Sequence, residues 1–150
     1  MEQISDRKMR KELVYDMKSI DEIILMLADN NSADVQKRGI ELAQKIKNIG
    51  VFFKPYYLGI DSKILWKNCA EIIVSKTDEE LEPYLTDMIK WFDEYNSPGV
   101  QLIFERLKKY KKSEILDYEL KWHLKLNKIL EKNNVVVLLE NLIQVRKNNN

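Results

Sequence analysis

The chain has 150 residues, of which 45% are hydrophobic and 33% charged, and its net charge is +1. This is typical of a single globular domain, and the near-neutral charge argues against a nucleic-acid or membrane partner. The single cysteine excludes an internal disulfide framework. The longest apolar run, Ile23 to Ala28, is too short to span a bilayer, and the N-terminus lacks the apolar stretch of a signal peptide. We therefore expect a cytoplasmic protein.

Apolar residues recur three or four positions apart along nearly the whole chain, which predicts helices. The first predicted helix runs from Met9 to Ile20, where apolar residues recur at this spacing. Ser19 is the expected N-cap of the second helix, with Glu22 as its capping-box partner. Ser32 caps the third predicted helix, and Gly50 closes it as the left-handed residue that follows a helix.

The middle of the chain also contains residues that typically begin or interrupt helices. The next helix is predicted to start at Asp61 or Ser62. Thr77 and Glu80 match a second capping box. Pro83 lies too far along this helix to belong to its first turn, so a break just before Pro83 and a restart are expected.

The last third of the chain predicts three more helices. Ser97 is the expected N-cap of the first, with Pro98 preset for the first helical position. Ser113 caps a long helix that runs to about Lys132. The two asparagines that follow break it, and the last helix covers Val135 to Val145.

These signals together predict an all-α fold of about seven or eight helices joined by short turns, so that consecutive helices are antiparallel neighbours. The pattern Ser32-x-x-Val35-Gln36 recurs as Ser97-x-x-Val100-Gln101. This echo favours stacked helical hairpins, a HEAT-like α-solenoid, with an irregular bundle as the alternative. Residues 1–147 are expected to form the single domain and residues 148–150 a disordered tail.

Catalytic and metal-binding constellations are missing from the sequence. His123 is the only histidine, and nothing near it supplies a nucleophile or a second ligand, so we interpret it as a surface or boundary residue. Cys69 shares an apolar helix face and is expected to pack as a small hydrophobe. The four glycines are isolated, which excludes a phosphate loop. We therefore expect no enzyme activity, no cofactor, no metal and no small-molecule substrate.

The charges are unevenly distributed. Residues 61–105 hold 4 basic and 10 acidic side chains, a net charge of −6, and residues 106–150 hold 11 basic and 5 acidic side chains, a net charge of +6. Such charges can also complement the helix dipole. The acidic residues of Asp78–Glu82 lie at a predicted helix start, and the basic residues of Arg106–Lys112 lie at a predicted helix C-terminus. A contact surface is the alternative for the acidic segment, and nucleic-acid binding is the less favoured alternative for the basic one.

Trp66 and Trp91 each precede a polar residue by two positions, Asn68 and Asp93. Such polar side chains often cap a helix or support a neighbouring loop. The alternative is an aromatic and carboxylate cluster on one edge of the stack, which is the anchor set that protein interfaces favour.

Several stretches between residues 20 and 110 resemble a family of HEAT-like helical proteins, a bacterial domain-of-unknown-function family whose members are often immunity proteins of polymorphic or contact-dependent toxin systems. These stretches are Trp66–Ile72, Asp78–Leu85, Trp91–Gly99 and Ile103–Leu107.

The resemblance implies a protein that binds a cognate toxin and occludes its active site. The net charge of −6 in residues 61–105 suits a basic toxin such as a nuclease. The alternatives are a generic adaptor for another cytoplasmic protein and a nucleic-acid-binding protein that uses Arg106–Lys112. The residues expected to contact the partner are Glu79, Glu80, Glu82, Asp87, Asp93 and Glu94 through charge, and Trp66, Trp91 and Tyr95 as aromatic anchors.

Overall fold

The helices predicted from the apolar spacing are present throughout the described chain. The structure is a computed structural model that describes residues 18–55 and 61–149, so the first predicted helix, up to residue 17, lies outside the described residues. No strand occurs in these two ranges, which confirms the all-α prediction. The α-helices are α2 (Ile20–Met26), α3 (Ala33–Ala43), α4 (Lys63–Val74), α5 (Asp78–Leu81), α6 (Leu85–Lys90), α7 (Val100–Lys109), α8 (Glu114–Ile129) and α9 (Asn133–Asn148).

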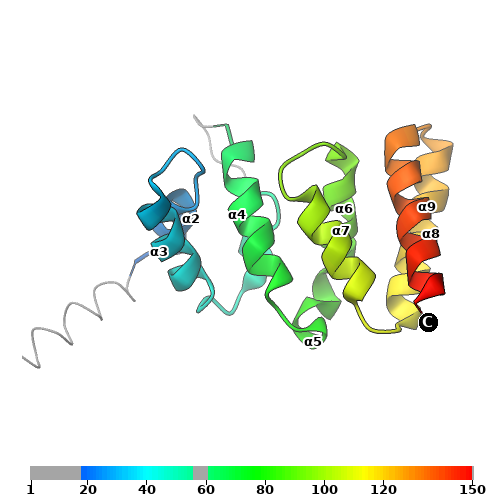
Figure 1. The fold of residues 1–150 in the computed structure, drawn as a ribbon, viewed down its shortest axis with the longest axis horizontal. Helices are drawn as coiled ribbons and strands as arrows, with labels where there is room; N and C mark the ends of the chain where they lie inside the picture. Colours follow the sequence, from blue (N-terminus) through cyan, green and yellow to red (C-terminus); the bar gives the residue numbers. More distant parts are fainter. Residues whose placement is uncertain (1–17, 56–60, 150) are drawn as a thin grey trace, which may run out of the picture.

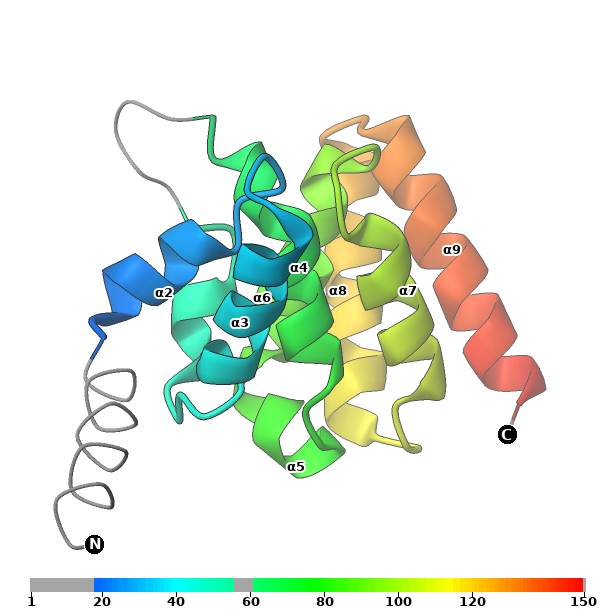
Figure 2. The same ribbon diagram turned by 60° about the vertical axis from the view of Figure 1, so that its left-hand side comes forward.

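The helices stack in two layers (Figure 1). Helices α3, α4, α7 and α9 lie side by side in the front layer, each in contact with the next, and Figure 2 shows the same row after rotation. Behind them, α6 and α8 contact each other, and α2 packs against α3. In each of the pairs α2–α3, α6–α7 and α8–α9, the second helix runs back antiparallel to the first, as predicted for stacked antiparallel hairpins. No helix in the described ranges is both long and apolar enough to cross a membrane.

Four of the predicted N-caps are confirmed. The Ser19 hydroxyl accepts a hydrogen bond from the third backbone N–H beyond it at 3.1 Å, and the Ser32 hydroxyl does the same at 3.3 Å. Ser113 caps α8 in this way at 3.1 Å. Thr77 and Glu80 form the full reciprocal capping box. Each cap satisfies a backbone donor that the first helical turn leaves unpaired.

The break at Pro83 is also confirmed. A 3₁₀ turn over Glu82–Tyr84 separates α5 from α6, because proline has no N–H to continue the helix. A second 3₁₀ turn, Trp91–Glu94, follows α6 directly. Helix α4 begins at Lys63 with Ser62 in the N-cap position, as expected.

The predicted start of α7 is wrong by two residues. The N-cap is Gly99 with φ of 90°, and Ser97 is buried with its hydroxyl unpaired. An added Cβ at Gly99 would lie 2.7 Å from the Ala70 Cβ and 3.2 Å from the Trp66 carbonyl oxygen. The close approach of α7 to α4, together with the left-handed conformation, therefore selects glycine at this position over the Ser97 cap.

Two other helix boundaries differ from prediction. Gly50 does not close α3, which ends at Ala43, and lies instead in a 3₁₀ turn over Ile49–Phe52. Helix α8 ends before the two asparagines, because Glu131 takes a left-handed φ of 57°. The backbone N–H groups of Glu131 and Lys132 then donate to the carbonyl oxygens of Lys128 and Asn127. Helix α9 accordingly includes both asparagines and continues to Asn148, into the residues predicted as a disordered tail.

Candidate functional site

The two tryptophans expected to be contact anchors belong to the core. Trp91 is 0% exposed, and its indole N–H donates to the Pro98 carbonyl oxygen at 3.1 Å. Trp66 is 8% exposed and packs edge-on against Trp91 at 6.3 Å between ring centroids. Their role as aromatic anchors is not supported, because both rings are buried where α4 packs against the α6–α7 hairpin.

The other predicted contact residues are at the surface. All six carboxylates are exposed, and Tyr95 is 46% exposed. They lie on α5, on α6 and around the 3₁₀ turns before and after α6, and of these helices α6 belongs to the back layer. Asp93 and Tyr95 line one open pocket of about 400 Å³, together with residues 131–135 of the α8–α9 turn.

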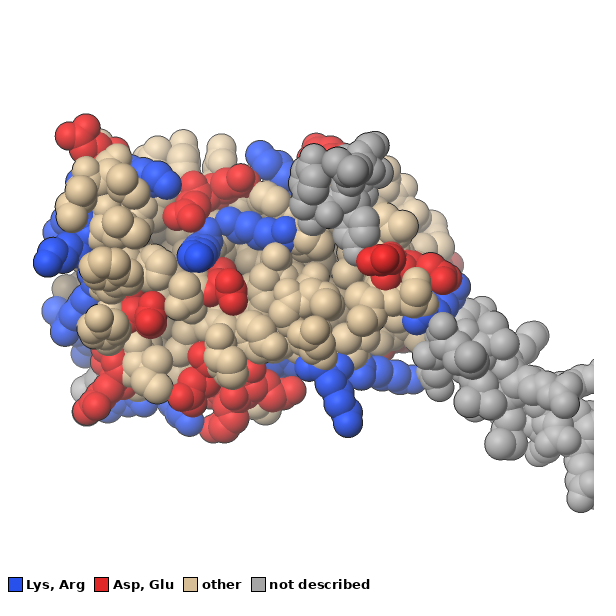
Figure 3. Space-filling view, turned by 180° about the vertical axis from the view of Figure 1, so that it is seen from behind, with Lys and Arg blue, Asp and Glu red and all other residues tan. Residues whose placement is uncertain are grey.

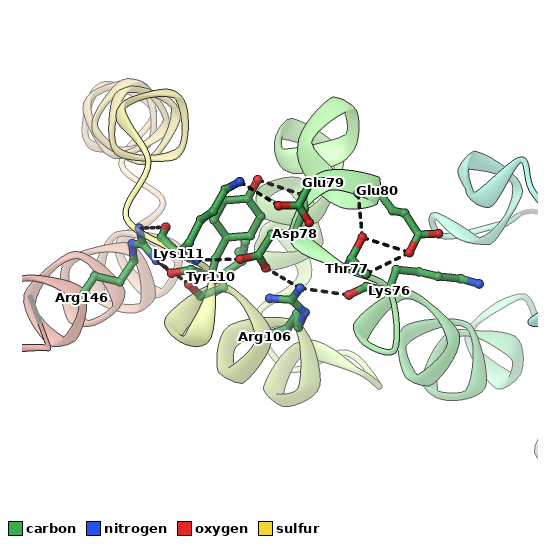
Figure 4. A network of polar contacts seen from close by, with 10 residues as sticks. Lys76, Thr77, Asp78, Glu79, Glu80, Arg106, Tyr110, Lys111 and Arg146 are labelled. Carbon is green, nitrogen blue, oxygen red and sulfur yellow. Dashed lines mark hydrogen bonds and ion pairs between the residues drawn. The ribbon is translucent and has the colours of Figure 1, made fainter.

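The acidic start of α5 is largely paired within the chain (Figure 4). Asp78 accepts a 2.6 Å hydrogen bond from the Arg106 guanidinium and a 3.0 Å bond from the Lys111 backbone N–H. The Tyr110 hydroxyl donates to the Asp78 carbonyl oxygen at 3.0 Å. The acidic segment and the basic segment that the sequence separates are therefore brought together, where they join α5 to the end of α7.

Two predicted contact residues are part of this internal pairing. The Glu79 carboxylate is 3.0 Å from the Lys111 ammonium, and Glu80 completes the Thr77 capping box. Glu94 is 3.9 Å from Lys63 in an exposed pair. Among the predicted contact carboxylates, those with neither an ion pair nor a capping bond to a described residue are Asp87 on α6 and, in the 3₁₀ turns on either side of it, Glu82 and Asp93.

The Asp78 pairing makes folding stability depend on pH. Burial alone would raise the pKa of the Asp78 carboxyl, but hydrogen bonds from Arg106 and from the Lys111 N–H outweigh burial and hold this pKa below its ordinary value. A carboxyl whose pKa is lower in the folded protein than in the unfolded chain stabilises the fold at pH values above the unfolded pKa, which is about 4. This stabilisation is lost as the pH falls through the pKa of the folded protein. We expect Asp78→Asn to cost about 1 kcal/mol at neutral pH.

The measurement is urea unfolding from pH 7 to pH 3. Below about pH 4 the difference between wild type and Asp78→Asn should shrink. Asp87→Asn, which alters a carboxylate with no ion pair to a described residue, is the matched control and should track the wild type throughout. A pH-independent difference for Asp78→Asn would contradict this assignment.

An exposed apolar stripe on α8 was missed by the sequence analysis. Tyr118 is 68% exposed and Trp122 is 50% exposed, and Ile115 and Ile129 continue the same side of the helix at spacings of three, four and seven. The spacing of these four residues in the sequence already indicated an apolar stripe along one side of a helix. However, α8 has a second helical stripe that includes Leu116 and Leu120, and the sequence alone does not say which of the two packs inward.

This stripe lies beside α6, which carries Asp87, one of the carboxylates without an ion pair to a described residue. The Thr86 hydroxyl donates to Glu119 at 3.1 Å, which ties α6 to α8. Figure 3, which views the stack from behind, shows an uncharged surface over α8 and charged side chains over the neighbouring α6. We name this surface the α6–α8 face and define it by Glu82, Asp87, Asp93, Ile115, Tyr118, Trp122 and Ile129.

The lone histidine and the lone cysteine both have packing roles. His123 is buried against Glu119, at 3.6 Å, and is not the surface or boundary residue that we expected. Burial lowers its pKa, partly opposed by Glu119, which favours the neutral imidazole. Cys69 is buried as predicted, and burial raises the pKa of its thiol to about 12, which suppresses the reactive thiolate.

Within residues 18–55 and 61–149, no group of histidine, cysteine, aspartate and glutamate side chains is arranged to hold a metal ion. Comparison of the chain with models of known protein families, with curated proteins and with solved structures finds no match. The candidate site is therefore defined by its own geometry, as a surface of exposed aromatic side chains next to carboxylates that form no ion pair with a described residue.

Proposed function

We propose that this protein is a non-enzymatic protein-binding module whose partner docks on the α6–α8 face. The observation that carries the proposal is the stripe with Tyr118 and Trp122 exposed on α8. Large aromatic side chains at the surface are the usual anchors of protein interfaces, since they bury much apolar area at little cost in conformational entropy. Contiguous exposed apolar surface is itself a mark of an interaction site.

The carboxylates beside the stripe support a basic partner. Asp87 and Asp93 form no ion pair with described residues, so their charges are available to steer an approaching cationic protein. We propose that this partner is a bacterial toxin domain whose active site the stack occludes. The resemblance to HEAT-like immunity proteins supports this choice. The single buried cysteine supports a reducing, cytoplasmic setting.

The test is binding and growth rescue with the toxin domain encoded next to this gene. Trp122→Ala should weaken binding by about 30-fold, which corresponds to roughly 2 kcal/mol, the size typical of an interface hot spot. Leu25→Ala on α2 removes a similarly exposed apolar side chain (45% against 50%) far from this face and should change binding little.

Charge is tested with a matched pair of double variants. Asp87→Lys with Asp93→Lys should slow association and abolish rescue. Glu71→Lys with Glu140→Lys makes the same change in net charge at exposed positions on α4 and α9, in the other layer, and should retain rescue. If the folded wild-type protein neither binds the toxin domain nor restores growth, the proposal that the partner is this toxin is wrong. Equal loss in both double variants would remove the α6–α8 face as the docking surface.

A further inference from the structure

A basic groove lies where α7 and α9 end, and it is lined by none of the residues that define the α6–α8 face. It is an open cavity of about 460 Å³, and no aspartate or glutamate belongs to its lining. Five of its seven lining residues are cationic. The lining consists of Lys108, Lys109, Tyr110, Lys111, Lys112, Arg146 and Asn149.

One wall of the basic groove is a buried arginine held in place by backbone carbonyls. Arg146 is 4% exposed and donates to the carbonyl oxygens of Leu107 at 2.9 Å, Tyr110 at 2.7 Å and Lys111 at 3.1 Å. These bonds fix the guanidinium but leave its charge in place, and its Nε has no hydrogen-bond partner. The nearest carboxylate, that of the half-exposed Asp117, is 3.6 Å away. This ion pair with a half-exposed partner neutralises the buried charge only in part, so an anion beside the guanidinium would be stabilising.

The lysines add charge that the protein only partly neutralises. Lys111 pairs with Glu79 at 3.0 Å, and Lys108 pairs with Glu105 at 3.8 Å in an exposed contact. Lys109 and Lys112 are exposed and form no ion pair with any residue that the structure describes. Helix dipoles favour cations at a helix C-terminus. That preference accounts for basic residues near the end of α7, but not for their convergence on one concave surface.

We infer that the basic groove binds a small phosphate-bearing anion with two or more negative charges, such as a diphosphate group. Its volume is within the range of small-molecule sites, whereas a nucleic-acid strand is followed by an extended track of cations. Single-stranded nucleic acid also needs exposed aromatic rings for base stacking. The one aromatic side chain in the groove, Tyr110, is buried and donates its hydroxyl to the Asp78 carbonyl.

The experiment is calorimetric titration of the full chain with pyrophosphate at low ionic strength. We expect saturable one-to-one binding that weakens with added salt. The double variant Lys109→Glu with Lys112→Glu should weaken binding tenfold or more. The control, Lys125→Glu with Lys128→Glu, changes two exposed lysines on α8 outside the groove by the same charge and should bind as the wild type does. All four side chains are exposed, so both variants are expected to fold.

Binding that does not saturate, or an equal loss in the two double variants, would show only general attraction of anions and would overturn the inference. A mixed-sequence RNA or DNA oligonucleotide is the second titrant. If it binds through Lys109 and Lys112 with a steep salt dependence while pyrophosphate does not, the groove is a nucleic-acid surface and the small-anion inference fails. These outcomes are independent of the toxin assay, because the groove shares no residue with the α6–α8 face.

Discussion

Trp91→Ala is expected to lower the free energy of unfolding by about 4 kcal/mol, whereas Trp122→Ala is expected to lower it by less than about 0.5 kcal/mol. The Trp91 ring is fully buried, and its removal would leave a cavity among well-packed neighbours. It would also leave the Pro98 carbonyl without its 3.1 Å donor and remove the edge contacts with Trp66 and Phe53. Trp122 is half exposed, so its truncation removes little buried contact.

Urea unfolding at neutral pH measures both variants against the wild type. For a chain of 150 residues, about 4 kcal/mol corresponds to a fall of roughly 12 °C in Tm. Trp91→Phe serves as the control, because it keeps an aromatic ring in the cavity and should recover part of the loss. Equal, small effects of Trp91→Ala and Trp122→Ala would mean that the Trp91 ring is not a core element. The same two alanine variants should rank in the opposite order in partner binding.

The tryptophans also show what the sequence could and could not predict. Helical periodicity and capping signals gave the all-α hairpin stack, because N-caps such as Ser32 and Ser113 act through local hydrogen bonds to the next turn. Whether an aromatic residue faces the core or the solvent depends on which helices pack on it. That depends on residues distant in the sequence. The sequence therefore indicated the buried Trp91 as a contact residue and did not single out the exposed Trp122.

For the same reason, the charge pattern could not predict which carboxylates are paired within the chain. The sequence separates an acidic third from a basic third, but the fold places the start of α5 against the end of α7. Asp78 and Glu79 are consequently paired with Arg106 and Lys111. Net charge per segment counts these residues as available to a partner. Only the tertiary contact shows that Glu82, Asp87 and Asp93 are among the carboxylates left without an ion pair to described residues.

A second tertiary contact at the end of α7, made by Arg146 of α9, is also expected to contribute strongly to stability. Arg146→Met should lower the free energy of unfolding by about 3 kcal/mol, because the carbonyl oxygens at the end of α7 would lose their donors. Removal of a buried charge also relieves a desolvation cost, which acts in the opposite direction. We expect the loss of hydrogen bonds to dominate. Of the three oxygens, only that of Leu107 has a second donor, the Tyr110 backbone N–H at 3.2 Å.

Arg146→Lys separates charge from hydrogen-bond geometry. A lysine ammonium keeps the charge but lacks the planar fork that reaches three carbonyl oxygens at once, so we expect it to recover only part of the loss. The free energies of unfolding of these variants are compared in urea. Lys128→Met on α8 is the control, because it removes an exposed cation. If Arg146→Met is as stable as the wild type, the cost of burying the guanidinium equals the value of its three bonds. The arginine would then owe its place to the anion that it faces in the basic groove, and pyrophosphate should stabilise the wild type but not Arg146→Met.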